Sequence, residues 1–134
     1  SKDPVTQVGA CIVNDKKRIV GIGYNGFPRG VDDDQFPWDK NSEWINSKYP
    51  YVVHAEPNAI LNSTVPLENS TLYVTLFPCN ECAKLVIQSG IKEVVYLVDK
   101  YHHRDMFLAS RRMFDASGVV YRQMSPISVE ITND

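Results

Sequence analysis

The sequence predicts an α/β sandwich, in which crossover helices cover a mixed sheet of about five strands. The first observation is a pair of β-rich runs near the start of the chain, separated by an Asn-Asp turn. The second is the alternation of helical and strand-like segments from residue 54 to residue 123. The third is the length, because 134 residues suit one domain with a single core. We therefore expect a single domain over residues 1–134, in which only the strands joined through helices need to run parallel.

The first half of the chain predicts a hairpin followed by a long loop. Strands are expected over residues 7–13 and 18–24, on either side of Asn14-Asp15. Cys11, inside the first strand, is interpreted as a small buried side chain and not as a metal ligand. Residues 25–50 show no period and contain several prolines and glycines, so we expect a loop whose aromatic residues pack down.

An acidic run and the chain start leave alternatives open. The run of Asp32, Asp33 and Asp34 is interpreted as a solvated turn, with a hard-cation site as the alternative. The chain begins with Ser1 and runs almost at once into a strand, which fits either a processed chain or a domain of a longer protein.

The second half predicts three helices that alternate with three strands. The helices run from His54 to about Ser63, from Asn80 to about Ser89 before Gly90, and from Arg104 to about Ser117 before Gly118. The strands are expected over residues 71–75, 94–98 and 119–123. The last helix carries an apolar stripe that we expect to face the sheet, formed by Met106, Phe107, Ala109, Met113 and Phe114.

Composition excludes several classes of protein. Hydrophobic residues make up 43% and charged residues 22%, as in ordinary globular domains. No apolar run approaches the roughly 20 residues that span a bilayer, and the start lacks a signal-peptide pattern. The net charge of −2 argues against charge-driven binding to nucleic acid. Three cysteines, two of them in a C-x-x-C, indicate a reducing compartment and a metal site.

Two short motifs together predict a catalytic zinc site. His54-Ala-Glu56 stands at one helix start, and Pro78-Cys79-x-x-Cys82 stands at the next. Cysteines three apart share one helix face and can bind one metal. The side chains of His54 and Glu56 can point toward the same metal site only if both residues lie at the start of the helix. Pro57 is also tolerated there, in the first turn.

The motifs also predict the chemistry at this site. Three protein ligands leave the fourth zinc position for water, whose pKa zinc lowers to around 7. Glu56 would then stand beside this water as a proton shuttle. The same pair of motifs is the signature of the zinc deaminases. A structural zinc knuckle or a redox dithiol is the alternative, but the knuckle would need a second ligand pair, for which His102-His103 is the remaining candidate.

Longer stretches resemble the deoxycytidylate (dCMP) deaminases of the cytidine and deoxycytidylate zinc deaminase family. The resemblance covers about Lys2 to Tyr121 and rests on residues 8–13, 21–28, 48–51, 54–60, 76–84, 91–94 and 99–102. It implies a cytidine deaminase-like α/β/α sandwich that converts dCMP and water to dUMP and ammonia, with zinc-bound hydroxide attacking C4. It also implies a hydrolase of cyclic amidines in pyrimidine nucleotide biosynthesis, a cytoplasmic location, a homo-oligomer, and allosteric control by dCTP and dTTP. Residues 1–8 do not predict the helix that usually precedes the first strand in this family, which fits a domain taken from a longer protein.

The resemblance further implies four substrate contacts. Asn25 would bind the sugar, the backbone of Ala55 the pyrimidine O2, and the carbonyl of Phe77 the exocyclic amine. Tyr101 would pack on the base, as aromatic rings do. From the residues alone, a turn is the preferred interpretation of Asn25-Gly26, and the alternative for Tyr101 is an exposed aromatic at the end of the sheet.

One departure from the family bears on the number of phosphates. The segment after Tyr101 is often acidic in dCMP deaminases, whereas this chain has cations there and in the long loop: Arg29, His102, His103, Arg104, Arg111 and Arg112. Clustered cations suit more phosphate charge, so we hypothesise dCTP as an alternative substrate or as an activator, with Mg²⁺ accompanying the triphosphate. The alternative is that Arg111 and Arg112 line the solvent face of a helix. A polynucleotide cytosine deaminase and a non-catalytic zinc protein are less favoured, because the chain lacks a basic face and carries Glu56.

Overall fold

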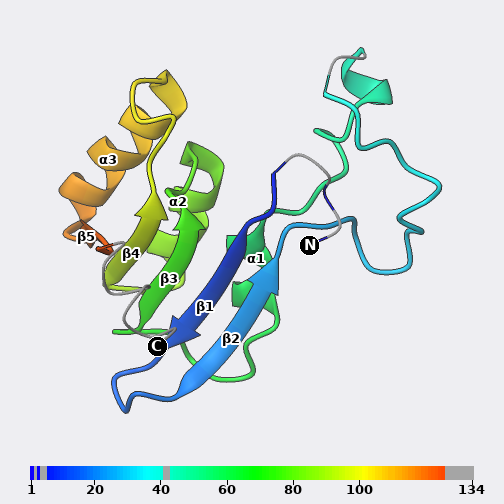
Figure 1. The fold of residues 1–134 in the computed structure, drawn as a ribbon. Coiled ribbons are helices and arrows are strands. Elements are labelled where there is room, and N and C mark those ends of the chain that lie inside the picture. The colour runs from blue at the N-terminus through cyan, green and yellow to red at the C-terminus, as the bar shows by residue number, and fades with distance from the viewer. Residues whose placement is uncertain (2, 4–5, 41–42, 126–134) are drawn as a thin grey trace.

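A five-stranded mixed sheet with three helices on one face forms the frame of the protein (Figure 1). The computed structural model describes residues 1, 3, 6–40 and 43–125, so residues 126–134 of the predicted domain lie outside the described residues. The elements are, in order, β1 (Gly9–Val13), β2 (Ile19–Tyr24), η1 (Trp44–Asn46), α1 (Ala55–Leu61), β3 (Thr71–Leu76), α2 (Asn80–Gln88), β4 (Glu93–Val98), α3 (Asp105–Ser117) and β5 (Val120–Gln123).

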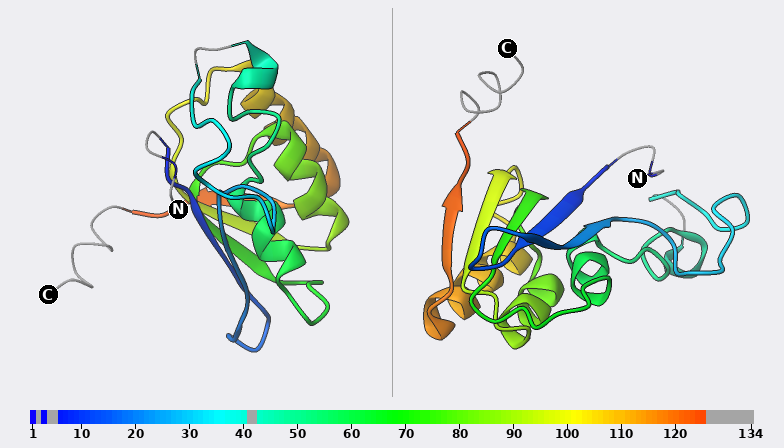
Figure 2. Two further views of the ribbon diagram at one scale, coloured as in Figure 1. Left: turned by 90° about the vertical axis from the view of Figure 1, so that its right-hand side faces the viewer. Right: turned by 90° about the horizontal axis from the view of Figure 1, so that it is seen from below.

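The strand order is β2-β1-β3-β4-β5. β1 is antiparallel to both β2 and β3, while β3, β4 and β5 run parallel. Each connection that contains a helix moves in the same direction across the sheet. Right-handed crossovers then place all three helices on the same face. Figure 2 shows α1, α2 and α3 together on that side, and the predicted mixed sheet with crossover helices is confirmed.

The core lies between this helical layer and the sheet. Ile12, Leu72 and Val94 point from three neighbouring strands into it and are fully buried. Phe77 and Phe114 meet edge to face, with ring centroids 6.0 Å apart. The predicted stripe of α3 holds for Phe107 and Phe114, which are buried, but not for Met106, which is 47% exposed. The buried face of α3 includes Ser110 in place of Met106. The Ser110 hydroxyl donates a hydrogen bond to the carbonyl oxygen of Pro78 at 2.9 Å.

Glycines end the second and third helices as predicted. Gly90 and Gly118 follow α2 and α3 with φ of 84° and 80°, the left-handed conformation that glycine adopts without steric cost. The start of α1 at Ala55 also confirms the first-turn position of Pro57. The helix is shorter than predicted: it ends at Leu61 and not near Ser63.

The long loop between β2 and α1 packs on itself through aromatic rings. Phe27 lies 4.2 Å from Trp38, and Phe36 lies 4.8 Å from Tyr51, both between ring centroids. The acidic run forms a turn in which the Asp34 N–H donates to the Asp32 side chain at 2.9 Å. Within the described residues, no helix has the length and apolar character needed to cross a membrane.

Candidate active site

Two helix starts meet at the C-terminal end of β3. His54 is the N-cap residue of α1, and Cys79 is the N-cap residue of α2. Glu56 follows in the first turn of α1, and Cys82 in the first turn of α2. Side chains at these positions extend past the helix ends, which carry partial positive charge and favour thiolates.

The three predicted ligands lie together. His54 Nδ1 is 3.2 Å from Cys82 Sγ and 3.6 Å from Cys79 Sγ. All three ligand atoms lie within 4.8 Å of one another, as in no other His, Cys, Asp or Glu group of the described chain. Tetrahedral zinc with bonds of about 2.0–2.3 Å needs ligand atoms about 3.6–3.8 Å apart. The donor set therefore fits zinc, and Cys11 lies outside it, half-buried on β1.

Hydrogen bonds within this group shift the pKa values of its members. The hydrogen bond from the Cys82 thiol, helped by His54, lowers the pKa of Cys79 to about 4. The hydrogen bond to Cys79 raises the pKa of His54, and the pKa of Cys82 is raised by its own bond to Cys79 and by burial. Cys79 is therefore a thiolate at neutral pH, the form that binds metal.

Glu56 is an enclosed carboxyl group beside the three ligands. It is 4% exposed, and burial raises its pKa to about 7. A carboxyl group with this pKa can both accept and release a proton near neutral pH.

Two glycines of β2 allow α1 to approach the sheet closely enough to hold this geometry. A Cβ at Gly23 would lie 2.3 Å from the backbone nitrogen of Ala59 and 2.5 Å from the carbonyl oxygen of Ala55. A Cβ at Gly21 would lie 2.5 Å from the carbonyl oxygen of Ala59. The absence of side chains at these two positions therefore sets the position of α1, and with it His54 and Glu56.

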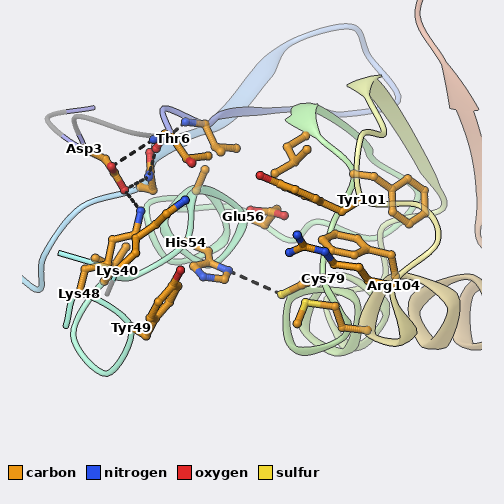
Figure 3. A pocket seen from close by; sticks show the side chains of 18 residues that line it. Asp3, Thr6, Lys40, Lys48, Tyr49, His54, Glu56, Cys79, Tyr101 and Arg104 are labelled. Carbon is orange, nitrogen blue, oxygen red and sulfur yellow. Dashed lines mark hydrogen bonds and ion pairs between the residues drawn. The ribbon is translucent and has the colours of Figure 1, made fainter. Parts of the chain in front are cut away.

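The ligand group opens into a pocket of about 370 Å³. Figure 3 shows His54 and Cys79 in its middle, with Asp3, Lys40, Lys48 and Tyr49 on one side and Arg104 on the other.

The four predicted substrate residues all line this pocket. Ala55 and Phe77 are buried at its floor. Tyr101 has the Arg104 guanidinium 4.3 Å from its ring centroid and the Phe107 ring stacked at 5.9 Å. Asn25 is 6% exposed, and its side chain hydrogen-bonds the segment that precedes β1.

The six predicted cations are spread more widely than the sequence suggested. Arg104 lines the pocket, whereas Arg29, His102, His103 and Arg112 are exposed and do not. Arg111 forms an ion pair with Asp99 and lies with its guanidinium 4.1 Å from the Phe77 ring centroid.

Three further charged residues line the pocket and were not found from the sequence: Asp3, Lys40 and Lys48. Lys40 and Lys48 lie in the loop without periodicity, and Asp3 lies before the first strand. An isolated charge in such segments carries no sequence signal. The neighbouring Lys48-Tyr-Pro-Tyr run, part of the resemblance, was the one available indication.

Fold and site together define a zinc-dependent hydrolytic enzyme domain, with three metal ligands and an adjacent carboxyl group among the described residues. Residues 1–98 match the family described as cytidine and deoxycytidylate deaminase zinc-binding region. The chain belongs to this family.

Relatives and solved structures agree with this assignment. The deoxycytidylate deaminase of Pongo abelii is 54% identical over all of this chain and 76% of its own length. The probable deoxycytidylate deaminase of Drosophila melanogaster is 57% identical over all of this chain and 70% of its own. The crystal structure of dCMP deaminase from the cyanophage S-TIM5 in complex with dCMP and dUMP matches with a TM-score of 0.70 at 28% identity, covering 92% of this chain and 85% of the other.

Proposed function

We propose that this protein is a zinc-dependent hydrolase that deaminates dCMP to dUMP and ammonia. The observation that carries this proposal is the convergence of His54, Cys79 and Cys82 beside buried Glu56, in a pocket of mononucleotide size. Identity of 52–57% to deoxycytidylate deaminases supports dCMP as the substrate.

Zinc is the cofactor that the donor set fits, with His54, Cys79 and Cys82 as ligands. When bound, zinc would lower the pKa of a water molecule to around 7 and so supply a nucleophile at neutral pH. Glu56 takes one proton from the attacking water and transfers it to the ring nitrogen of cytosine. It then takes the proton of the new C4 hydroxyl group and passes it to the amino group, which leaves as ammonia while the C4 carbonyl forms. Its burial keeps bulk water away from these transfers and places its pKa near 7.

The remaining pocket residues hold the nucleotide. The backbone N–H of Ala55 binds the pyrimidine O2, the carbonyl of Phe77 accepts from the exocyclic amine, and Tyr101 packs on the base. Asn25 binds the sugar. The phosphate is bound by Arg104, the predicted cation that lines the pocket.

The arrangement of the cations favours a monophosphate. A triphosphate with Mg²⁺ would bring more negative charge into the pocket, where the cations are Arg104, Lys40 and Lys48, and Lys48 is already paired with Asp3. Arg111 is paired with Asp99, and Arg112 is exposed outside the pocket. Homo-oligomer formation, control by dCTP and dTTP, and a cytoplasmic location stay predictions.

The test is a Glu56→Ala variant assayed for ammonia release from dCMP, dCDP, dCTP, deoxycytidine and single-stranded DNA, with zinc content measured in parallel. We expect the wild type to prefer dCMP. The variant should retain zinc and lose about 10²–10⁴-fold in kcat, the usual contribution of general acid–base catalysis. Glu81→Ala is the matched control, because Glu81 also lies in a first helical turn but is exposed and pairs with Lys84.

The possible outcomes separate the alternatives. Loss of zinc from Glu56→Ala would make Glu56 a structural residue, and full activity of this variant would refute its acid–base role. A wild-type preference for dCTP would overturn the monophosphate assignment, and turnover of single-stranded DNA alone would indicate a polynucleotide deaminase.

A further inference from the structure

A buried ion pair lies in the pocket wall at the end away from Arg104 (Figure 3). Asp3 Oδ2 pairs with Lys48 Nζ, and the two side chains are 0% and 8% exposed. Desolvation offsets much of the attraction within a buried ion pair, so such a pair is a poor source of stability. Its place in the wall of the pocket points to a role in the site.

Asp3 contacts Asn25, the residue predicted to bind the sugar. The Asn25 Nδ2 group donates one proton to Asp3 Oδ2 at 3.4 Å and the other to the carbonyl oxygen of Thr6 at 2.7 Å. The other carboxylate oxygen, Asp3 Oδ1, accepts from the Thr6 N–H at 3.1 Å. A flip of the Asn25 carboxamide would place its oxygen against a carboxylate and a carbonyl, so these contacts fix the orientation of the amide.

This orientation presents Asn25 Oδ1 as an acceptor. The Val8 N–H donates to this oxygen at 2.9 Å. A carboxamide oxygen can accept two hydrogen bonds, so it can also accept from a hydroxyl of a ligand. The sugar of a 2′-deoxynucleoside 5′-phosphate carries a single hydroxyl, at the 3′ position. Asn25 lines the pocket, so its carboxamide oxygen is a candidate acceptor for this hydroxyl.

Lys48 makes a carboxylate tolerable at this position. An unpaired Asp3 would be a buried charge in the wall of a pocket that binds an anionic phosphate, and both its desolvation and its repulsion of the ligand would be unfavourable. The ammonium group of Lys48 balances that charge while Asp3 keeps its contact with Asn25.

We propose that Asp3, with its charge balanced by Lys48, is a positioning residue that holds the Asn25 carboxamide as the acceptor for the 3′-hydroxyl of the sugar. Asp3 thereby sets the preference of the enzyme for a substrate that carries this hydroxyl. The inference rests on the proposed function, because it takes dCMP as the substrate.

The experiment compares kcat/KM for dCMP and for 2′,3′-dideoxycytidine 5′-monophosphate in the zinc-loaded protein. The ratio of the two values measures recognition of the 3′-hydroxyl, and a general loss of folded enzyme does not change it. We expect Asp3→Ala to lower the ratio about tenfold, the effect of one hydrogen bond. Asn25→Ala should lower it at least as much, and the Asp3→Ala/Asn25→Ala double variant should lower it no further than Asn25→Ala alone.

Two further variants serve as rescue and control. Asp3→Asn still offers an oxygen to the Asn25 Nδ2 group and should keep most of the preference. Asp15→Asn changes an exposed carboxylate in the β1–β2 turn and should leave the ratio unchanged. If Asp3→Ala does not fold, Asp3→Ala/Lys48→Met, which removes both buried charges, takes its place with the same expected fall.

An unchanged ratio in the Asp3→Ala background, alongside a fall in Asn25→Ala, would overturn the inference. A double variant with a ratio well below that of Asn25→Ala would also overturn it, because Asp3 would then act independently of Asn25. If the wild type fails to deaminate dCMP, the proposed function fails. The positioning role is then decided by calorimetric binding of dUMP and its 3′-deoxy analogue to the same variants, where an equal loss of affinity for both would overturn it.

Discussion

Individual cations around the pocket differ in their surroundings, and these differences determine what each can bind. Arg104 lines the pocket and lies over the Tyr101 ring. Arg111, about two helical turns further along α3, forms an ion pair with Asp99 and lies over the Phe77 ring. Arg112 is exposed on the same helix. The three arginines therefore differ in role: Arg104 is a candidate to bind the phosphate, Arg111 packs on Phe77, and Arg112 is a solvated charge.

We predict that Arg104→Ala weakens recognition of the phosphate. A hydrogen bond to a charged group contributes about 1.5–3 kcal/mol, so kcat/KM for dCMP should fall at least tenfold. Deoxycytidine lacks the phosphate, and its kcat/KM should change little. Steady-state kinetics with both substrates measure the difference, with Arg112→Ala as the control on the same helix. Equal losses for both substrates would show that Arg104 acts through Tyr101. If Lys40→Ala instead causes the loss that is specific to dCMP, the phosphate binds at the opposite end of the pocket.

The metal site was predictable from the sequence at the residue level, and the ion pair was not. His54, Glu56, Cys79 and Cys82 occur in short motifs whose spacing already determines which side chains share a helix end. Asp3 and Lys48 are 45 positions apart, and only Lys48 lies in one of the short stretches that carry the resemblance. Their contact depends on how the loop before α1 folds back to the start of the chain, which no local pattern encodes.

The elements themselves were predicted well where the pattern is periodic and bounded by glycine. α2 and α3 end where Gly90 and Gly118 indicated, because a left-handed residue is a local requirement of the backbone. Met106 was misplaced because helical spacing alone leaves open which side of a first turn faces the core. The 3₁₀ helix η1 was missed because three residues are too few to show a period.

The contact between β2 and α1 gives a prediction at the level of elements. Gly23→Ala places a Cβ within 2.3–2.8 Å of the α1 backbone, so the helix must move away from the sheet. Overpacking of this kind costs about 1–3 kcal/mol or more, and it should also displace His54 and Glu56. We expect a lower midpoint of urea unfolding and a weaker affinity for zinc in competition with a chelator.

Gly9→Ala is the matched control for this prediction. It is also a strand glycine, but the nearest atom to its added Cβ is 3.7 Å away, an ordinary contact. Its zinc affinity should equal that of the wild type. A Gly23→Ala protein with wild-type stability and zinc affinity would show that the close approach of α1 is unimportant.

On the scale of the whole molecule, the sheet brings distant segments to one edge. The ends of β2 and β3, the segments before α1 and after β4, and the start of the chain all contribute to the pocket. This convergence follows from the α/β alternation, because the carboxyl ends of parallel strands meet at one edge of a sheet.

The same convergence predicts that zinc stabilises the entire domain. The ligands tie α1 to α2, and both helices cover the core, so loss of the metal should weaken the packing of the sheet as well as the site. A ligand that binds only the folded state at 1,000 times its Kd adds about 4 kcal/mol to the free energy of unfolding, which corresponds to a Tm shift on the order of 10 °C.

Chelation of zinc should therefore lower the Tm by this amount in calorimetry, and re-addition of zinc should restore it. Cys82→Ala should abolish the shift, while Cys11→Ala, on a strand outside the ligand group, should retain it. A Tm that does not respond to chelation, or a response that depends on Cys11, would contradict the assignment of the metal site.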